Sequence, residues 1–363
     1  MALVTMEKKM AKKELVKGNE ALGYGAIMAG CRFYFGYPIT PQNEVPEFMS
    51  RELPKVGGTF LQAESEVSAI NMVYGVAATG ARVMSSTSST GFSLMQEGIS
   101  AIAAADLPAV VVNVMREGPG GGGIGPSQLD YLQVTKGGGH GGYKTIVLSP
   151  SSVQETFDLI QLSFHLADKY RMVVILLSDA TIGQMMEPIE MRKLEEGPLP
   201  EKDYVVTGNE NARKSRILPL LITAADDQTL FQKYHDNLAR KMEVITSSEI
   251  RYDTFLLDDA EILIVAYGSV ARISETAIEM VREEGLRAGM IRPISLVPYP
   301  YEQVGQAVGR ARKTLVVESS MGQMIEDVKL AAAGRGDISF YGRVGKVISP
   351  EEIFEKIKEM AKS

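Results

Sequence analysis

Two glutamates, Glu64 and Glu66, lie two residues apart in the stretch LQAESEVSAI, directly before a long run of small and apolar residues. Glu66 is the last charged residue before Arg82 and falls in the first turn of a predicted helix. A helix dipole stabilises an anion at that position, so acids are common there without any catalytic role. A carboxylate held away from water at the same place could instead share a proton with a bound molecule. The residues alone favour the ordinary helix-start glutamate and leave the catalytic carboxylate open.

A second candidate is Arg116, which ends a predicted buried strand and begins the glycine-rich loop REGPGGGGIGPSQ. A guanidinium is costly to bury unless it is paired. Its planar fork can hold a carboxylate through two hydrogen bonds, and the glycines that follow let backbone N–H groups approach an anion. The alternative is a salt bridge to Glu117 or to another carboxylate of the chain. The sequence leaves these two interpretations equally open.

Hydroxyl groups gather in TSSTGFS, where a predicted strand ends and a helix begins. Ser89 or Thr90 could cap that helix, which is the simpler interpretation, or could line a ligand pocket. Two other glycine-rich stretches carry weaker signals. GYGAIMAG lacks the spacing and the preceding strand of a dinucleotide site, and GGGHGGYKT lacks the adjacent Gly-Lys-Ser/Thr of a phosphate-binding loop. His140 in the second stretch is more simply a solvent-facing loop residue than a ligand contact.

Strands alternate with helices from about residue 17 to residue 190, which predicts an α/β fold with a parallel sheet. In such sheets ligands bind at the carboxyl ends of the strands. The loops expected there are GYPITP, AESE, TSSTGF and REGPGGGGIGPSQ, so the candidate residues should converge. A helix is predicted after the first loop, with Thr40 as its N-cap and Pro41 in its first position. A second α/β unit starts near residue 258, after a polar stretch that contains one charged helix.

Composition excludes several classes of protein. The 363 residues carry a net charge of −7, whereas a nucleic-acid-binding protein normally has a basic surplus. No run of 18 apolar residues is present and no apolar segment follows the basic residues near the N-terminus, so neither a membrane helix nor a secretory signal is expected. Cys31 is the single cysteine, which excludes an internal disulfide and a four-thiolate iron–sulfur cluster and fits a cytoplasmic protein. The three histidines show no metal-binding spacing.

Taken together and in this order, seven segments resemble those of the alpha subunit of the 2-oxoacid:ferredoxin oxidoreductases. They read GYPITP, ESEVSAINMVYG, SSTGFSLMQEG, REGPGGGGIGPSQ, AYGSVAR, MIRPISLVP and VVESSMGQ. The resemblance runs from about residue 14 to the end of the chain. It is closest to the branched-chain (2-oxoisovalerate) branch, because the glycine loop reads GPGGGGIGPSQ where the 2-oxoglutarate branch has Gly-Pro-Ser-Thr-Gly. It implies a pyrimidine-binding domain at 14–190, a linker or insert at 191–257, and a transketolase C-terminal-like domain at 258–363.

The resemblance implies a thiamine-diphosphate-dependent oxidative decarboxylation of a 2-oxoacid to an acyl-coenzyme A and CO2, with reduction of ferredoxin. Glu66 matches the carboxylate that faces N1′ of the aminopyrimidine, where it favours the imino tautomer that can take the C2 proton of the thiazolium. Thr40 matches a threonine that hydrogen-bonds the oxo acid, and Arg116 matches a region that binds the substrate carboxylate. Glu64 has no such match and could be structural. The residues implied to line the cofactor pocket are Pro38, Ile39, Ser89, Thr90 and Gly91.

The motif that holds Mg²⁺ and the diphosphate in thiamine enzymes, Gly-Asp-Gly followed by Asn, is not matched by GRGDIS, the one similar string in the sequence. This chain is therefore expected to bind the pyrimidine half of the cofactor and no metal. The resemblance assigns Mg²⁺ and the diphosphate contacts to a beta subunit, and the iron–sulfur clusters to small gamma and delta subunits. Three alternatives stay open: another 2-oxoacid as substrate, an assembly subunit that has lost its site, and another thiamine enzyme such as a transketolase.

Overall fold

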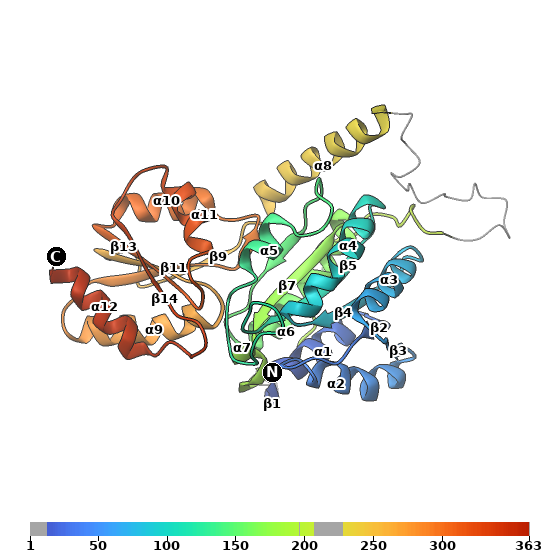
Figure 1. Ribbon diagram of the computed structural model, residues 1–363, viewed down its shortest axis with the longest axis horizontal. Helices are drawn as coiled ribbons and strands as arrows, with labels where there is room; N and C mark the ends of the chain where they lie inside the picture. Colours follow the sequence, from blue (N-terminus) through green and yellow to red (C-terminus); the bar gives the residue numbers. More distant parts are fainter. Residues whose placement is uncertain (1–12, 196, 207–227, 363) are drawn as a thin grey trace, which may run out of the picture.

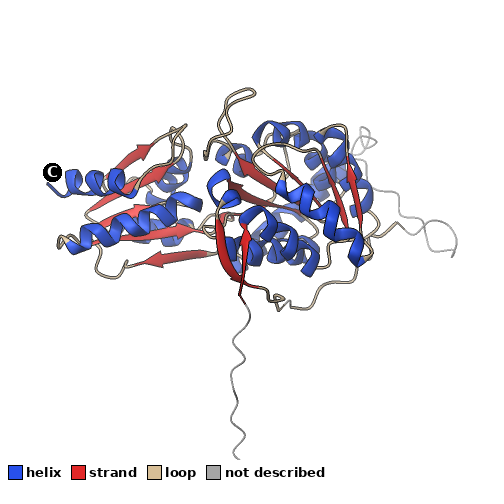
Figure 2. Ribbon diagram, turned by 90° about the horizontal axis from the view of Figure 1, so that it is seen from below, coloured by secondary structure: helices blue, strands red, loops and turns tan. Residues whose placement is uncertain are grey.

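The computed structural model describes residues 13–195, 197–206 and 228–362, so most of the basic N-terminal segment lies outside the described residues. The chain forms two α/β units that lie side by side, with the C-terminal helix at the far end of the second unit (Figure 1). Figure 2 shows the same two units from below, each with helices packed on its strands.

The first unit is built on a seven-stranded sheet with the order β12-β6-β7-β5-β4-β2-β3. Its strands are β2 (Phe33–Gly36), β3 (Thr59–Gln62), β4 (Val83–Thr87), β5 (Ala109–Met115), β6 (Ile146–Leu148), β7 (Val173–Asp179) and β12 (Ser295–Val297). Six of these strands are parallel, and β12, at one edge, is antiparallel to its neighbour β6. The predicted parallel α/β fold is confirmed, and the carboxyl ends of β2, β3, β4 and β5 lie at the same edge.

Helices cover both faces of this sheet. One face is packed by α3 (Glu66–Ala77), α4 (Ser89–Ala104) and α5 (Tyr131–Lys136), and the other by α1 (Gly18–Met28), α2 (Glu44–Glu52) and α6 (Val153–Tyr170). In β5, Val111 packs with the first group of helices, whereas Val110 and Val112 pack with the second. The strand is buried along its whole length, which explains why its sequence, AVVVNVM, is nearly continuous in apolar residues.

The second unit has a five-stranded sheet with the order β14-β13-β10-β11-β9. Its elements are β9 (Tyr252–Phe255), β10 (Ile262–Val265), α9 (Gly268–Glu283), β11 (Ala288–Pro293), α10 (Tyr301–Arg310), β13 (Lys313–Glu318), α11 (Met324–Ala332), β14 (Ile338–Gly342) and α12 (Pro350–Lys362). Helices α9 and α12 pack on one face of the sheet, and α10 and α11 on the other. The antiparallel edge strand β9 is the exception to the parallel order.

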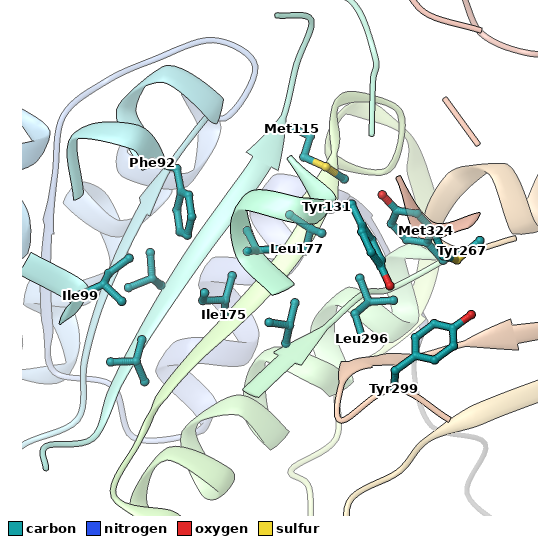
Figure 3. Packing of buried hydrophobic residues seen from close by; sticks show 14 of the residues in the cluster. Phe92, Ile99, Met115, Tyr131, Ile175, Leu177, Tyr267, Leu296, Tyr299 and Met324 are labelled. Atoms are coloured by element: carbon teal, nitrogen blue, oxygen red, sulfur yellow. The ribbon is translucent and has the colours of Figure 1, made fainter. Parts of the chain in front are cut away.

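One hydrophobic core runs from the first unit into the second. Figure 3 shows Phe92, Ile175 and Leu177 of the first sheet and its helices continuing into Tyr131 and Tyr267, whose ring centroids are 5.5 Å apart. Polar contacts accompany this core. Gln128 donates its backbone N–H to the Ser319 carbonyl at 2.7 Å and its side-chain amide to the Tyr267 carbonyl at 2.8 Å. The second unit therefore holds the chain segment that follows the glycine-rich loop.

Two strands pair outside the ranges that were predicted as their domains. Strand β12, from the range 258–363, pairs with β6 of the first sheet, and β9, from the range 191–257, pairs with β11 of the second. The division at residues 190 and 257 stays a prediction. Five further elements are β1 (Lys13–Lys17), which pairs with β8 (Met186–Glu190), the 3-10 helix η1 (Leu53–Val56), the short helix α7 (Ala180–Gln184), and the charged helix α8 (Gln228–Ser248).

The predicted start of the second helix is wrong. The structure begins α2 at Glu44 with Asn43 before it, so Thr40 is not its N-cap and Pro41 is not its first residue. A turn intervenes, in which the Gln42 N–H donates to the Ile39 carbonyl at 3.0 Å. Thr40 and Pro41 therefore belong to the loop after β2, and this change leaves Thr40 free to contact the glycine-rich loop.

Candidate active site at the carboxyl ends of the parallel strands

Glu66 lies where β3 turns into α3. Ser65 caps this helix by accepting a hydrogen bond from the Ser68 N–H at 3.3 Å, so Glu66 becomes the first helical residue and points into the protein. Its side chain is only 5% exposed. Among the residues that the structure describes, none donates a hydrogen bond to its carboxylate and no cation pairs with it. Burying a carboxylate without a partner costs free energy, which indicates that a polar ligand binds here.

Glu64 has a different environment. It is exposed and accepts a hydrogen bond from the Ser68 hydroxyl, and this bond lowers the pKa of its carboxyl below the ordinary value. Its charge is therefore satisfied by solvent and by its own helix start. Of the two glutamates, Glu66 faces the protein interior and Glu64 faces solvent.

Gly91 allows the start of α4 to approach Glu66. A methyl group built on Gly91 would overlap both the Thr87 Oγ1 and the Glu66 Oε1, and would lie 2.8 Å from the Glu66 Cδ. The carboxylate and the threonine hydroxyl therefore both lie against the bare Cα of this glycine. Side chains from β4 and α3 meet the backbone of α4 at this point, as the convergence of the strand ends predicted.

Several buried polar atoms at this edge of the sheet have no partner among the described residues. The buried atoms that make no hydrogen bond to any described residue include Gln42 Nε2, Asn43 Oδ1, Thr87 Oγ1, Ser88 Oγ and Arg116 Nε. Most buried polar groups in folded proteins are satisfied, and a cluster of exceptions indicates a place where a polar molecule binds. Of these atoms, Thr87 Oγ1 lies beside Glu66 against Gly91, and the two together could bind a cofactor that has both hydrogen-bond donors and acceptors.

Arg116 connects three loops of this edge. Its guanidinium donates to the Thr40 carbonyl at 2.8 Å, to the Gly121 carbonyl at 2.9 Å and, more weakly, to the Thr90 hydroxyl at 3.5 Å. No carboxylate of the described chain forms an ion pair with it, and the salt bridge to Glu117 is not formed. The positive charge of Arg116 is therefore available to an anion.

Glu117 instead turns into its own glycine-rich loop. Its carboxylate accepts from the Gly125 N–H at 3.4 Å, and its backbone N–H donates to the Gly125 carbonyl at 3.1 Å. A side chain on Gly122 or Gly123 would overlap Glu117, so the glycines here are required for the loop to close around it. The closed loop places the Gly121 carbonyl beside Arg116.

The remaining predicted residues lie around the same edge. Thr40 lines an open depression of about 430 Å³. The residues of this depression, called the Thr40 depression below, are Pro38, Ile39, Thr40, Asn43, Pro46, Glu47, Ser50, Phe60 and Gln62. Pro38 and Ile39 are among the residues that line it. Ser89 and Thr90 contact Arg116, so the predicted residues form two neighbouring groups joined by the start of α4.

Two buried residues of this edge were missed by sequence reasoning. Asn113, in the middle of β5, accepts from the Ser89 N–H at 2.9 Å, and Asp130 accepts from the Ser89 hydroxyl at 2.6 Å. Burial raises the pKa of the Asp130 carboxyl above its ordinary value. Asn113 could have been found as the one polar residue in an apolar strand. His140, by contrast, is exposed, and its carbonyl accepts from the Ser100 hydroxyl at 2.7 Å, as expected of a loop residue.

Comparisons with known proteins decide the family. Residues 24–255 match the thiamine diphosphate-binding domain of pyruvate flavodoxin/ferredoxin oxidoreductases, and residues 260–353 match core domain II of pyruvate:ferredoxin oxidoreductase. The chain belongs to the 2-oxoacid:ferredoxin oxidoreductase family. The membership predicted from the loops is confirmed.

Relatives of this oxidoreductase subunit match it over nearly its whole length. It is 46% identical to the ketoisovalerate oxidoreductase subunit VorB of Methanothermobacter thermautotrophicus, over 96% of this chain and 98% of that protein. It is 35% identical to the 2-oxoglutarate synthase subunit KorA of Methanothermobacter marburgensis, over 97% of this chain and all of that protein. The names of both relatives describe subunits, so this oxidoreductase chain is a component of a multi-subunit enzyme.

Solved structures confirm the fold. A 2-oxoglutarate:ferredoxin oxidoreductase from Magnetococcus marinus, solved with 2-oxoglutarate, coenzyme A and succinyl-CoA, is 26% identical with a TM-score of 0.83, and the match covers 96% of this chain and 65% of that one. A split-gene transketolase, 12% identical with a TM-score of 0.58, shares the fold alone. Both agree with the predicted transketolase-like arrangement.

The described residues fit the cofactor named for the first matched domain. A buried carboxylate without a partner can face a protonated ring nitrogen, and the unpartnered Thr87 hydroxyl beside it can match another polar atom of a pyrimidine. No group of His, Cys, Asp and Glu side chains suited to a metal ion is present in the described ranges. No helix among the described residues has the length and apolar character needed to span a membrane.

Proposed function

We propose that this oxidoreductase subunit binds the pyrimidine half of thiamine diphosphate and carries out the oxidative decarboxylation of a branched-chain 2-oxoacid to an acyl-coenzyme A and CO2, with reduction of ferredoxin. The observation that carries the proposal is the carboxylate of Glu66, which is buried without a partner at the carboxyl edge of the sheet. When bound, thiamine diphosphate supplies the electron sink for the decarboxylation. Glu66 holds and shares the proton at N1′ of the aminopyrimidine, which is the role that a desolvated carboxylate suits.

Arg116 is proposed to bind the carboxylate of the 2-oxoacid. It has no ion-pair partner in the described part of the chain, and its Nε makes no hydrogen bond. Its contacts with the Thr40 carbonyl and the Gly121 carbonyl hold the planar fork in one orientation. A fixed guanidinium can grip a carboxylate with two charge-assisted hydrogen bonds. Thr40, on the same loop, is proposed to hydrogen-bond the oxo acid through its hydroxyl.

Replacing Arg116 with alanine is expected to raise the KM for the 2-oxoacid by about 10- to 100-fold, with a smaller change in kcat. The reason is that a hydrogen bond to a charged group contributes about 1.5–3 kcal/mol, and one such interaction with the ground state would be lost. Steady-state kinetics of the assembled enzyme, with coenzyme A and a low-potential dye as acceptor, measure the effect. Arg51→Ala is the matched control, because Arg51 is exposed, forms its ion pair with Glu52 and lies over the Phe48 ring. A rise in KM below about threefold for Arg116→Ala would remove Arg116 from the proposed site.

The Thr40 depression is proposed to receive the side chain of the substrate. Four of its lining residues, Pro38, Ile39, Pro46 and Phe60, are apolar, the others are polar, and the one charged residue among them is the acid Glu47. A second carboxylate, as in 2-oxoglutarate, would find no cation among the residues that line this depression and would be repelled by Glu47. The relative named as a ketoisovalerate oxidoreductase subunit, at 46% identity, supports the same choice.

The substrate is tested by reconstituting the enzyme from all its subunits and comparing 2-oxoisovalerate, 2-oxoglutarate, pyruvate and an aryl pyruvate. We expect kcat/KM for 2-oxoisovalerate to exceed that for 2-oxoglutarate by at least about 100-fold, since a second carboxylate would lie beside Glu47 with no cation among the residues that line the depression. A preference for 2-oxoglutarate would contradict the branched-chain assignment but not the family. The isolated chain serves as a control and is expected to be inactive. Activity of the isolated chain would contradict a shared site.

Partner subunits complete the proposal. A beta subunit is expected to hold the diphosphate through Mg²⁺, and small gamma and delta subunits are expected to hold the iron–sulfur clusters that pass electrons to ferredoxin. The single cysteine of this chain, Cys31, is buried, and burial raises its pKa to about 12, so it is an inert thiol. A cytoplasmic location is part of the same proposal.

A further inference from the structure

We propose that Asp130 is a positioning residue that fixes Ser89 and, through Ser89, sets the place of Arg116 in the site. The inference rests on the proposed role of Arg116 in binding the 2-oxoacid. It is carried by a network of short hydrogen bonds beneath the strand ends, in which Asp130 contacts neither of the groups proposed to touch the substrate.

The carboxylate of Asp130 is directed away from its own helix. Asp130 directly precedes α5, where an aspartate ordinarily caps the helix, yet its side chain makes no capping hydrogen bond. Its Oδ2 instead accepts from the Ser89 hydroxyl at 2.6 Å and from the Asn113 Nδ2 at 3.0 Å. The residue is 9% exposed, and none of the described cations forms an ion pair with it. Burying a carboxylate without a cation costs free energy, and the two hydrogen bonds offset this cost.

Ser89 needs this support because its backbone is in an unfavourable conformation. It begins α4 with a φ of 25°, in the left-handed region that residues with a side chain rarely adopt. Such strain persists only where the surroundings enforce it, and it gathers at functional sites. The Asn113 side chain accepts from the Ser89 N–H at 2.9 Å and the Asp130 side chain accepts from its hydroxyl. Both the backbone and the side chain of the strained residue are therefore fixed by hydrogen bonds.

The hydroxyl of Ser89 then fixes the start of the glycine-rich loop. It accepts a hydrogen bond from the Arg116 N–H at 3.0 Å while its own proton is directed to Asp130. The Arg116 carbonyl lies 3.3 Å from the same hydroxyl and is the alternative acceptor for that proton. Loss of the Asp130 carboxylate would let the hydroxyl turn toward this carbonyl. Without the bond to Asp130 the Ser89 side chain is no longer held in this rotamer, so its oxygen can leave the Arg116 N–H, and the start of the glycine-rich loop loses this contact.

The second unit of the protein sets the place of Asp130 itself. Two residues before it, Gln128 is hydrogen-bonded to the backbone of Tyr267 and Ser319. One residue after it, the Tyr131 hydroxyl donates to the Asp327 carboxylate at 2.7 Å. Asp130 therefore lies between two residues that are hydrogen-bonded to the second unit. Its own bond to Ser89 connects this fixed segment to the start of α4 in the first unit.

The test compares four variants in the reconstituted enzyme. Asp130→Ala is expected to raise the KM for 2-oxoisovalerate about tenfold while kcat changes less than about threefold. Asp130→Asn is expected to stay within about twofold of the wild type, because both bonds fall on one oxygen and an amide oxygen can accept both. Ser89→Ala should reproduce the effect of Asp130→Ala, and the double variant should be no worse than either single one, since both break the same link. Calorimetric titration with 2-hydroxyisovalerate, which has the carboxylate but no oxo group, measures Kd without turnover. The variants should rank in Kd as they rank in KM.

Two comparisons make each outcome decisive. Asp168→Ala removes another buried carboxylate, one that pairs with Arg82 and Lys202 away from the site, and should lower the thermal stability without raising KM. An equal rise in KM for Asp168→Ala, or an Asp130→Asn variant as poor as Asp130→Ala, would overturn the inference. If Arg116→Ala raises KM and Kd but Asp130→Ala does not, the positioning role of Asp130 is wrong while the proposed substrate site at Arg116 stands. If Arg116→Ala changes neither, the proposed substrate site fails.

Discussion

Replacing Glu66 with glutamine is expected to lower kcat of the assembled enzyme by about 10²- to 10⁴-fold, the usual contribution of a positioned proton-transfer group. Glutamine has nearly the same shape, so it can occupy the space against Gly91, but it cannot share a proton with the ring nitrogen. The free energy of unfolding of the apo complex should not fall, because the variant replaces a buried charge without a partner by a neutral group. Dye-reduction kinetics and thermal unfolding, measured on the same preparation, test both expectations.

Glu64→Gln is the matched control for this experiment. The two glutamates lie two residues apart in sequence, but Glu64 is exposed and its carboxylate accepts from the Ser68 hydroxyl. A neutral residue at that place should leave kcat unchanged and should shift the free energy of unfolding by less than about 0.5 kcal/mol. If Glu66→Gln kept activity within about tenfold of the wild type, or if Glu64→Gln lost it, the proton-sharing role of Glu66 would be wrong.

Adding one methyl group at Gly91 is expected to lower kcat/KM by about 100-fold. The Cβ of Gly91→Ala would overlap the Glu66 Oε1 and the Thr87 Oγ1, so the carboxylate must move by a substantial fraction of an ångström. A shift of about 1 Å in a catalytic group can cost a factor of 10² in rate. Overpacking at a buried site should also destabilise the fold by about 1–3 kcal/mol. Titration of thiamine diphosphate into the apo complex should show weaker binding, which separates misplacement of the site from loss of folded protein.

Gly75→Ala provides the control for the added methyl group. Gly75 lies in α3, the helix that Glu66 begins, and a Cβ built there meets no atom within 4 Å. Alanine in an exposed helix position stabilises by about 0.5–1 kcal/mol relative to glycine, so this variant should be equally active and slightly more stable. Wild-type activity in Gly91→Ala would show that the approach of α4 to the carboxylate has no functional role.

Local patterns were sufficient to predict most of the first sheet. Continuous apolar runs such as AVVVNVM predicted strands buried on both faces, and alternation with amphipathic helices predicted a parallel order, which in turn placed the loops with Glu66 and Arg116 at one edge. The start of α2 was missed because Thr40 and Pro41 have the residue types of a helix start, while the turn over residues 39–42 depends on contacts from outside the segment.

Strands β9 and β12 could not be foreseen for a related reason. Each is short, and its place is decided by pairing with a strand distant in sequence: β12 with β6 and β9 with β11. Asp130 was missed as well, because its residue type and position are those of an ordinary helix cap. Its actual partners, Ser89 and Asn113, lie 41 and 17 residues away in the chain.

The sequence by itself determined the family, the class of fold and the set of side chains available for chemistry, because these depend on residue types and on their order along the chain. The tertiary structure alone decided which of those side chains face one another. It turned Glu66 inward and Glu64 outward, left Arg116 without the ion pair to Glu117, and brought Asp130 beneath Ser89. The physical reason is that burial, hydrogen-bond partners and the availability of a charge are properties of the space around a side chain, which segments far apart in the sequence create together.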